Sequence, residues 1–164
     1  MAACLALALA ACATTGDAAA AHPEARAYSA TADATADVDA ALARAAASGK
    51  RVLLVLGANW CHDSRALAGW LETPRFAALT AQAYDVVFVD VGTPRTGEGR
   101  NLDIARRFGL ADMPGTPALL ALTPEGRTVN LDTAASWRNA ASRSDDAIYA
   151  ELAALAEAPA PPAP

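Results

Sequence analysis

Residues 52–65 carry the run VLLVLGANWCHDSR, in which a cysteine separates an apolar segment from a polar one. The valines and leucines of residues 52–56 predict a buried strand. Beyond the cysteine, apolar residues recur at helical spacing at Leu67, Trp70 and Leu71. Cys61 is therefore expected at the N-terminus of a helix, where unpaired N–H groups and the helix dipole favour a thiolate.

The composition indicates one compact domain with no nucleic-acid partner. The chain has 164 residues and a net charge of −5, and Lys50 is its only lysine. Its arginines are scattered and form no basic stripe, which argues against nucleic-acid binding. We expect a monomer without a cofactor.

The first residues suggest export and lipidation. An apolar segment at residues 2–13 is too short to span a bilayer and is typical of a secretory signal. Its end, Leu9-Ala10-Ala11-Cys12, resembles the bacterial lipobox. That resemblance implies a signal peptide at residues 1–11, a lipid on Cys12 and a membrane anchor facing the periplasm of the bacterial envelope. Alternatively, Cys12 is an ordinary residue of an alanine-rich tract. Loss of the signal would remove Cys4 and leave Cys61 without an intramolecular partner.

The rest of the chain predicts alternating helices and strands. We expect a flexible tether over residues 12–26, a domain over 27–157 and a disordered Pro/Ala tail over 158–164. Expected strands lie at residues 52–56, 86–91, 118–122 and 127–131. Expected helices lie at 33–48, after Cys61, at 101–108 and at 136–157, and Pro74 is expected to begin a further turn. This order predicts a mixed sheet with helices on both faces.

Three motifs in this order resemble the thioredoxin superfamily. Trp60-Cys61-His62-Asp63-Ser64 stands where that family has Trp-Cys-x-x-Cys. Thr116-Pro117 precedes an apolar strand as the family's cis-proline does, although Pro114 competes for that assignment. Phe108-Gly109-Leu110 resembles the family's approach to that strand. The resemblance implies an α/β fold with a thioredoxin-like mixed sheet of about four to five strands flanked by helices.

Two departures from the family pattern limit the chemistry. Ser64 replaces the resolving cysteine, so the site is a monothiol Cys-x-x-Ser variant. Val55 stands where many members bury an aspartate that assists proton transfer.

Candidate site residues follow from these motifs. We expect Cys61 to be a nucleophile, Ser64 to donate a hydrogen bond to its thiolate, and a protonated His62 to stabilise that thiolate. The resemblance implies that Trp60, Thr116 and Pro117 bind substrate. The alternatives are that Cys61 is a small packing residue and that His62 and Asp63 only serve the start of the helix.

A metal site is not expected from the two histidines of the chain. His22 lies in the predicted tether and His62 lies beside Cys61, and neither has ligand-like neighbours in the sequence.

Two function classes remain open. The first is monothiol thiol–disulfide exchange through Cys61, by isomerisation or mixed-disulfide handling, on protein or small-molecule thiols and disulfides. The second is a non-catalytic thioredoxin-fold module that binds peptides or proteins. The rate of Cys61 alkylation against pH discriminates between them, because a reactive thiolate supports the enzyme. A single-cysteine peroxidase is disfavoured, because the sequence around Cys61 has no Arg or Thr at the spacing that typically activates peroxide.

Overall fold

A computed structural model describes residues 22–160 and 162. The strands are β1 (Arg51–Gly57), β2 (Tyr84–Asp90), β3 (Gly92–Thr93), β4 (Glu98–Gly99) and β5 (Ala118–Leu122). The helices are α1 (Ala34–Ser48), α2 (His62–Glu72), α3 (Pro74–Ala83), α4 (Leu102–Arg107) and α5 (Asp145–Glu157), with 3-10 segments η1 (Pro94–Thr96) and η2 (Ala134–Ser142). Within this part of the chain, no helix combines the length and the apolar character needed to cross a bilayer.

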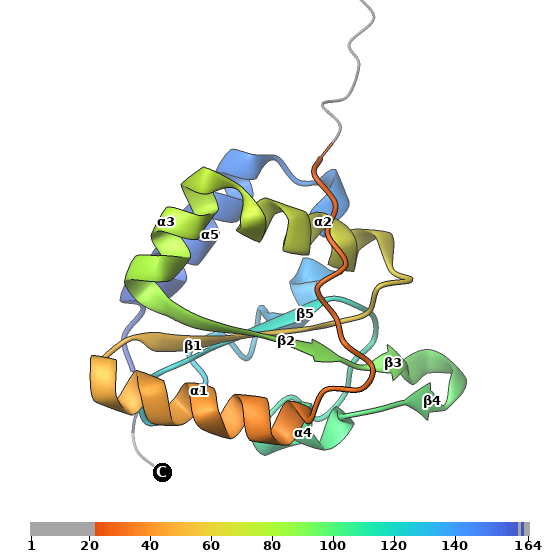
Figure 1. The fold of residues 1–164 in the computed structure, drawn as a ribbon, viewed down its shortest axis with the longest axis horizontal. Helices are drawn as coiled ribbons and strands as arrows, with labels where there is room; N and C mark the ends of the chain where they lie inside the picture. The colour runs from red at the N-terminus through yellow and green to blue at the C-terminus, as the bar shows by residue number, and fades with distance from the viewer. Residues whose placement is uncertain (1–21, 161, 163–164) are drawn as a thin grey trace, which may run out of the picture.

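The centre of the molecule is a mixed sheet in the order β2-β1-β5. Strand β1 runs parallel to β2 and antiparallel to β5, so Leu54 pairs with Val87 on one side and Leu120 on the other. Helices α1 and α4 cover one face, and α2, α3 and α5 cover the other (Figure 1). The predicted α/β class with helices on both faces is confirmed. The central sheet has three strands, and β3 and β4 form a separate hairpin.

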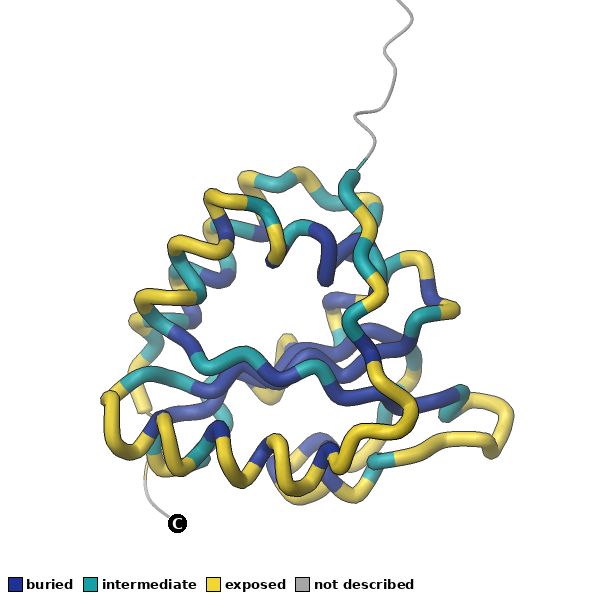
Figure 2. Tube along the Cα trace, in the orientation of Figure 1, coloured by how far each residue is buried: buried dark blue, intermediate teal, exposed yellow. Residues whose placement is uncertain are grey.

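Strand β1 is buried on both faces, which explains its continuous apolar sequence (Figure 2). Alternate residues belong to different cores. Leu54 and Leu56 pack in the core that contains Val38 of α1, whereas Leu53 and Val55 pack in the core that contains Leu67 of α2. This central strand therefore fixes the position of everything that follows Gly57, including the cysteine.

The predicted returning strand at residues 127–131 is wrong as a full strand. It makes a single bridge, between Leu122 and Thr128. The buried side chain of Asn130 explains the difference, because it accepts from the backbone N–H of Ala121 (2.9 Å) and donates to the carbonyl of Leu119 (2.9 Å). An amide side chain thus takes the place of strand backbone at the edge of β5.

The predicted last helix, residues 136–157, is interrupted. Arg143 is extended (φ −94°, ψ 147°), and Ser144 starts α5 by accepting a hydrogen bond from the N–H of Ala147 at 3.2 Å. Ser144 followed by two aspartates is a helix-start pattern that also favours the helix dipole. The sequence therefore contained the signal for this second start.

Candidate functional site

Cys61 lies where β1 ends and α2 begins, as predicted. It is the N-cap residue of α2, with extended backbone angles (φ −81°, ψ 125°). Its carbonyl accepts from the N–H of Arg65 at 3.1 Å, which is the first hydrogen bond of the helix. Cys61 is a free cysteine with 8% of its surface exposed. The thiol at this helix end is therefore largely covered by the rest of the protein.

The thiol meets the segment that precedes β5. The Thr116-Pro117 peptide bond is cis, and it is the sole cis bond in the described part of the chain. The Sγ of Cys61 donates to the carbonyl of Thr116 at 3.2 Å. The assignment of Thr116-Pro117 as the cis bond is therefore confirmed, and Pro114 is not the cis residue. A thiolate could not make this bond, since it has no proton to donate.

Ser64 lies on the inner side of α2 and is fully buried. Its hydroxyl has no hydrogen-bond partner among the described residues, so the expected bond to Cys61 is absent from this structure. The nearest surroundings include Gly57, where an added Cβ would clash with the Ser64 hydroxyl and the ring of Tyr28. The space around Ser64 therefore depends on a glycine at position 57.

Tyr28 is a site neighbour that the sequence analysis missed. Its buried phenol donates to the carbonyl of Ser64 at 3.3 Å. Burial raises the pKa of Tyr28 far above its ordinary value, and the nearby carboxylate of Asp90 raises it further. A lone aromatic residue in an alanine-rich segment was the one available signal.

Trp60 is the most exposed large apolar residue of the site, with 58% of its surface accessible. Its indole N–H donates to the carbonyl of Gly92 at 2.9 Å, which ties it to the β3–β4 hairpin. A pocket of about 420 Å³ opens beside it, lined by Trp60, Thr93, Pro94, Arg95, Thr96, Gly115 and Thr116. Two of the residues expected to bind substrate, Trp60 and Thr116, thus line one pocket. The third, Pro117, is the next residue after Thr116 in the chain.

The side chain of Asp63 bonds to η2 rather than to the thiol of Cys61. Its carboxylate accepts from the backbone N–H of Ala141 at 2.9 Å, in η2. The aspartate therefore joins the start of α2 to the segment packed against it, which is a structural role.

The residues from His22 to Tyr28, here called the strap, lie along α2. The N–H of Ala25 donates to the carbonyl of Arg65 at 3.0 Å. The side chain of Asn59 pairs with the backbone of Tyr28, donating to its carbonyl (2.7 Å) and accepting from its N–H (3.2 Å). The end of the predicted tether thus packs on the domain, while Cys12 and the rest of residues 1–21 lie outside the described residues.

Arg65 joins the strap to the loop that carries the cysteine. Its guanidinium donates to the carbonyls of Asn59 (3.1 Å) and Trp60 (3.0 Å) and to the carboxylate of Glu24 (2.9 Å). The hydrogen bond from Arg65 holds the pKa of Glu24 below its ordinary value, and His62 contributes in the same direction. Arg65 was not among the expected site residues, because nothing in its local sequence indicates a contact with Glu24, 41 residues away.

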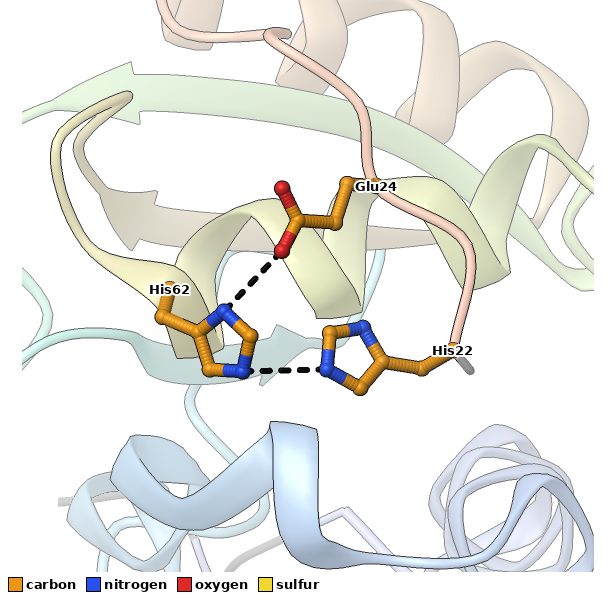
Figure 3. Close-up of side chains that lie close together, drawn as sticks. All are labelled: His22, Glu24 and His62. Atoms are coloured by element: carbon orange, nitrogen blue, oxygen red, sulfur yellow. Dashed lines mark hydrogen bonds and ion pairs between the residues drawn. The ribbon is translucent and has the colours of Figure 1, made fainter. Parts of the chain in front are cut away.

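The fold brings together ligand-like side chains that lie far apart in the sequence. The strap brings His22 and Glu24 to His62, and one potential ligand atom from each lies within 4.8 Å of the others. Figure 3 shows the three side chains pointing toward one another. The strap runs across α2, and the side chains of His22 and Glu24 reach the first residue of the helix, which the sequence did not indicate.

Comparisons with known proteins agree with this geometry. The sequence model of a family described as thioredoxin-like matches residues 33–124. A crystal structure of a disulphide isomerase from Xylella fastidiosa Temecula1 is similar, with 36% identity and a TM-score of 0.70. The match covers 77% of this chain and 93% of that one. No curated protein matches the sequence.

Proposed function

This chain belongs to the thioredoxin-like family, and from that premise we propose that Cys61 carries out monothiol thiol–disulfide exchange on protein or small-molecule disulfides. The observation that carries the proposal is the contact between the Cys61 sulfur and the Thr116 carbonyl, 3.2 Å apart, beside cis-Pro117. The similarity to a disulphide isomerase supports exchange chemistry in general.

The first step is attack on a substrate disulfide. Cys61 gives up its proton to solvent and releases the Thr116 carbonyl, which then becomes free to accept from the backbone N–H of an extended substrate. The thiolate attacks one substrate sulfur, a bond forms between that sulfur and Sγ, and the substrate S–S bond breaks. The second substrate sulfur leaves as a thiolate and takes a proton from solvent.

Resolution requires a thiol from elsewhere, because the hydroxyl of Ser64 cannot displace a bound sulfur. A second thiol of the same substrate can attack the mixed disulfide and release Cys61, which rearranges the substrate without net oxidation or reduction. An external small thiol can instead attack Sγ of Cys61, which releases the substrate as a free thiol and leaves the small thiol bound to Cys61. A second molecule of the thiol then frees Cys61, and the two small thiols leave as one disulfide.

The test is to trap the mixed disulfide. Wild-type protein incubated with glutathione disulfide should gain one glutathione on Cys61, located by mass spectrometry of proteolytic fragments. Cys61→Ser should gain none at that position, and folded wild-type protein that gains none would overturn the proposal.

Non-covalent peptide binding is the second candidate, and the pocket beside Trp60 favours it. The exposed indole and the 420 Å³ pocket offer an apolar contact next to the segment that precedes β5. In that case Cys61→Ser should bind extended peptides as well as wild-type protein does. Loss of peptide binding in the serine variant would favour covalent capture.

We further propose that the protein works at the bacterial envelope, anchored through a lipid on Cys12. The support is the Leu9-Ala10-Ala11-Cys12 sequence alone. Cys12→Ser should release the protein from membranes or block its processing. An unmodified Cys12 in the intact mass of the membrane-isolated protein would refute the anchor.

A further inference from the structure

The contacts between His22, Glu24 and His62 favour one tautomer of each neutral imidazole. The Nδ1 of His62 lies 2.9 Å from a Glu24 carboxylate oxygen, and the Nδ1 of His22 lies 3.4 Å from the carbonyl of Pro23. Carboxylate and carbonyl oxygens only accept hydrogen bonds, so each Nδ1 carries a proton. In the neutral imidazoles, each Nε2 then carries a lone pair.

The two Nε2 atoms face each other across 3.0 Å (Figure 3). Two lone pairs at this distance repel each other unless a cation lies between or beside them. Two zinc–nitrogen bonds of about 2.0–2.1 Å at a tetrahedral angle separate their nitrogens by about 3.3 Å. The observed separation is therefore close to that of a chelating pair.

We propose that His22 and His62 bind a divalent metal ion of the zinc type through their Nε2 atoms. Neutral imidazole suits borderline cations such as zinc. Glu24 accepts the Nδ1 proton of His62, the arrangement that orients histidine ligands around metals, and Arg65 holds its second carboxylate oxygen at 2.9 Å. The side chain of His62 is 58% exposed, so water completes the coordination.

The site joins two distant parts of the chain. His22 comes from the strap and His62 is the first residue of α2, so a bound ion adds a link across their interface. This role does not depend on the thiol, and its failure would leave the exchange proposal for Cys61 standing.

The first test uses the fact that the chain has two histidines. Long-range proton–nitrogen NMR spectra of the full chain therefore contain two imidazoles. Adding zinc sulfate should shift the Nε2 resonance of both rings, with Nδ1 remaining protonated in each. Saturating zinc that leaves both Nε2 resonances in place, or that shifts one ring alone, would overturn the proposal. Rings that respond to pH and not to zinc would show that a proton is the bridging cation, with the same result.

The second test measures zinc affinity by equilibrium dialysis. His22→Asn and His62→Asn should abolish the zinc equivalent that wild-type protein binds, and Glu24→Gln should weaken it by about 10–100-fold. The matched control is Glu72→Gln, which neutralises a carboxylate at the other end of α2 and should leave affinity unchanged. Cys61→Ser should also bind normally. Zinc that is lost in Cys61→Ser and kept in the histidine variants would place the ion on the thiol and overturn the proposal.

A third readout is hydrogen exchange at Ala25, whose N–H bonds to the carbonyl of Arg65. Zinc should slow this exchange several-fold in wild-type protein and leave it unchanged in His22→Asn. Equal exchange with and without bound zinc in wild-type protein would contradict a link between strap and helix.

Discussion

His62 and Ser64 belong to the same helical turn after Cys61, yet their surroundings are opposite. The His62 side chain is 58% exposed and has partners on both ring nitrogens, Glu24 and His22. Ser64 is fully buried, and its hydroxyl has no partner among the described residues. Ionic contacts thus gather on the outer side of the turn, where water weakens them. The inner side holds the unpaired hydroxyl of Ser64. In this buried environment the low dielectric makes each polar contact, made or missing, count more for stability.

The largest expected effect comes from changing the inner residue. Ser64→Cys places a second thiol one turn from Cys61, so a self-resolving dithiol becomes available. With no small thiol present, wild-type protein should show no insulin reduction with a dithiol-regenerating system, and the variant should gain measurable turnover. Turnover should be modest, since Val55 offers no proton-accepting carboxylate beneath the site.

The matched control is Ser48→Cys, which adds a thiol at the C-terminal end of α1. It should gain no turnover, because that thiol lies before the start of β1 while Cys61 follows its end. Equal turnover in both variants would contradict a specific role for position 64.

Because Tyr28 is buried on the same inner side, we expect the free energy of unfolding to fall at high pH. Burial raises the pKa of Tyr28 and of Tyr84 in the folded protein, so the neutral phenols are favoured there. The unfolded chain loses these protons above about pH 10, and the free energy of unfolding should fall by about 1.4 kcal/mol per pH unit for each phenol. Below about pH 10 neither phenol should affect the pH dependence.

Tyr28→Phe separates the two phenols. Urea unfolding between about pH 9 and 11.5 should show roughly half the wild-type slope in this variant. An unchanged slope would mean that Tyr28 ionises in the folded protein.

A smaller effect is expected from removing the unpaired hydroxyl. Ser64→Ala should raise the free energy of unfolding by about 1 kcal/mol, because a buried hydroxyl without a partner is destabilising. Thr128→Val is the matched comparison, since that hydroxyl donates to the carbonyl of Phe108 at 2.7 Å. It should lower the free energy of unfolding by about 1 kcal/mol. Equal signs for the two variants in urea unfolding would show that Ser64 has a partner in solution.

The smallest effect belongs to the outer residue. His62→Gln, measured by urea unfolding with a chelator present, should change the free energy of unfolding by no more than about 0.5 kcal/mol. Its ion pair with Glu24 is exposed, and such pairs contribute little. A decrease in the free energy of unfolding above about 2 kcal/mol would contradict the view that the outer side of the turn contributes little to stability.

The elements that place the thiol were predictable because their signals are local. The apolar run before Gly57 gave β1, the spacing of Leu67 and Leu71 gave α2, and their junction placed Cys61 at a helix start. The contact with Thr116-Pro117 followed from resemblance to a family, not from spacing, because the two segments are 55 residues apart.

The outer side of the site was not predictable from the sequence. His22 and His62 are 40 residues apart, and the strap around His22 is alanine-rich without a periodic apolar face. The strand predicted at residues 127–131 was wrong for a similar reason. The side chain of Asn130 makes hydrogen bonds to β5 that the backbone of a paired strand would otherwise make. Contacts between a side chain and a distant backbone leave no pattern in the residues that flank them.

One glycine shows how far the domain extends. At Gly69, inside α2, any side chain would overlap with the carbonyl group of Pro23. The helix surface therefore has a groove at this point, shaped to the main chain that crosses it. A shortened chain beginning at Ala27 would uncover this groove and leave Arg65 without Glu24. The contacts with α2 therefore begin several residues before the boundary that composition suggests.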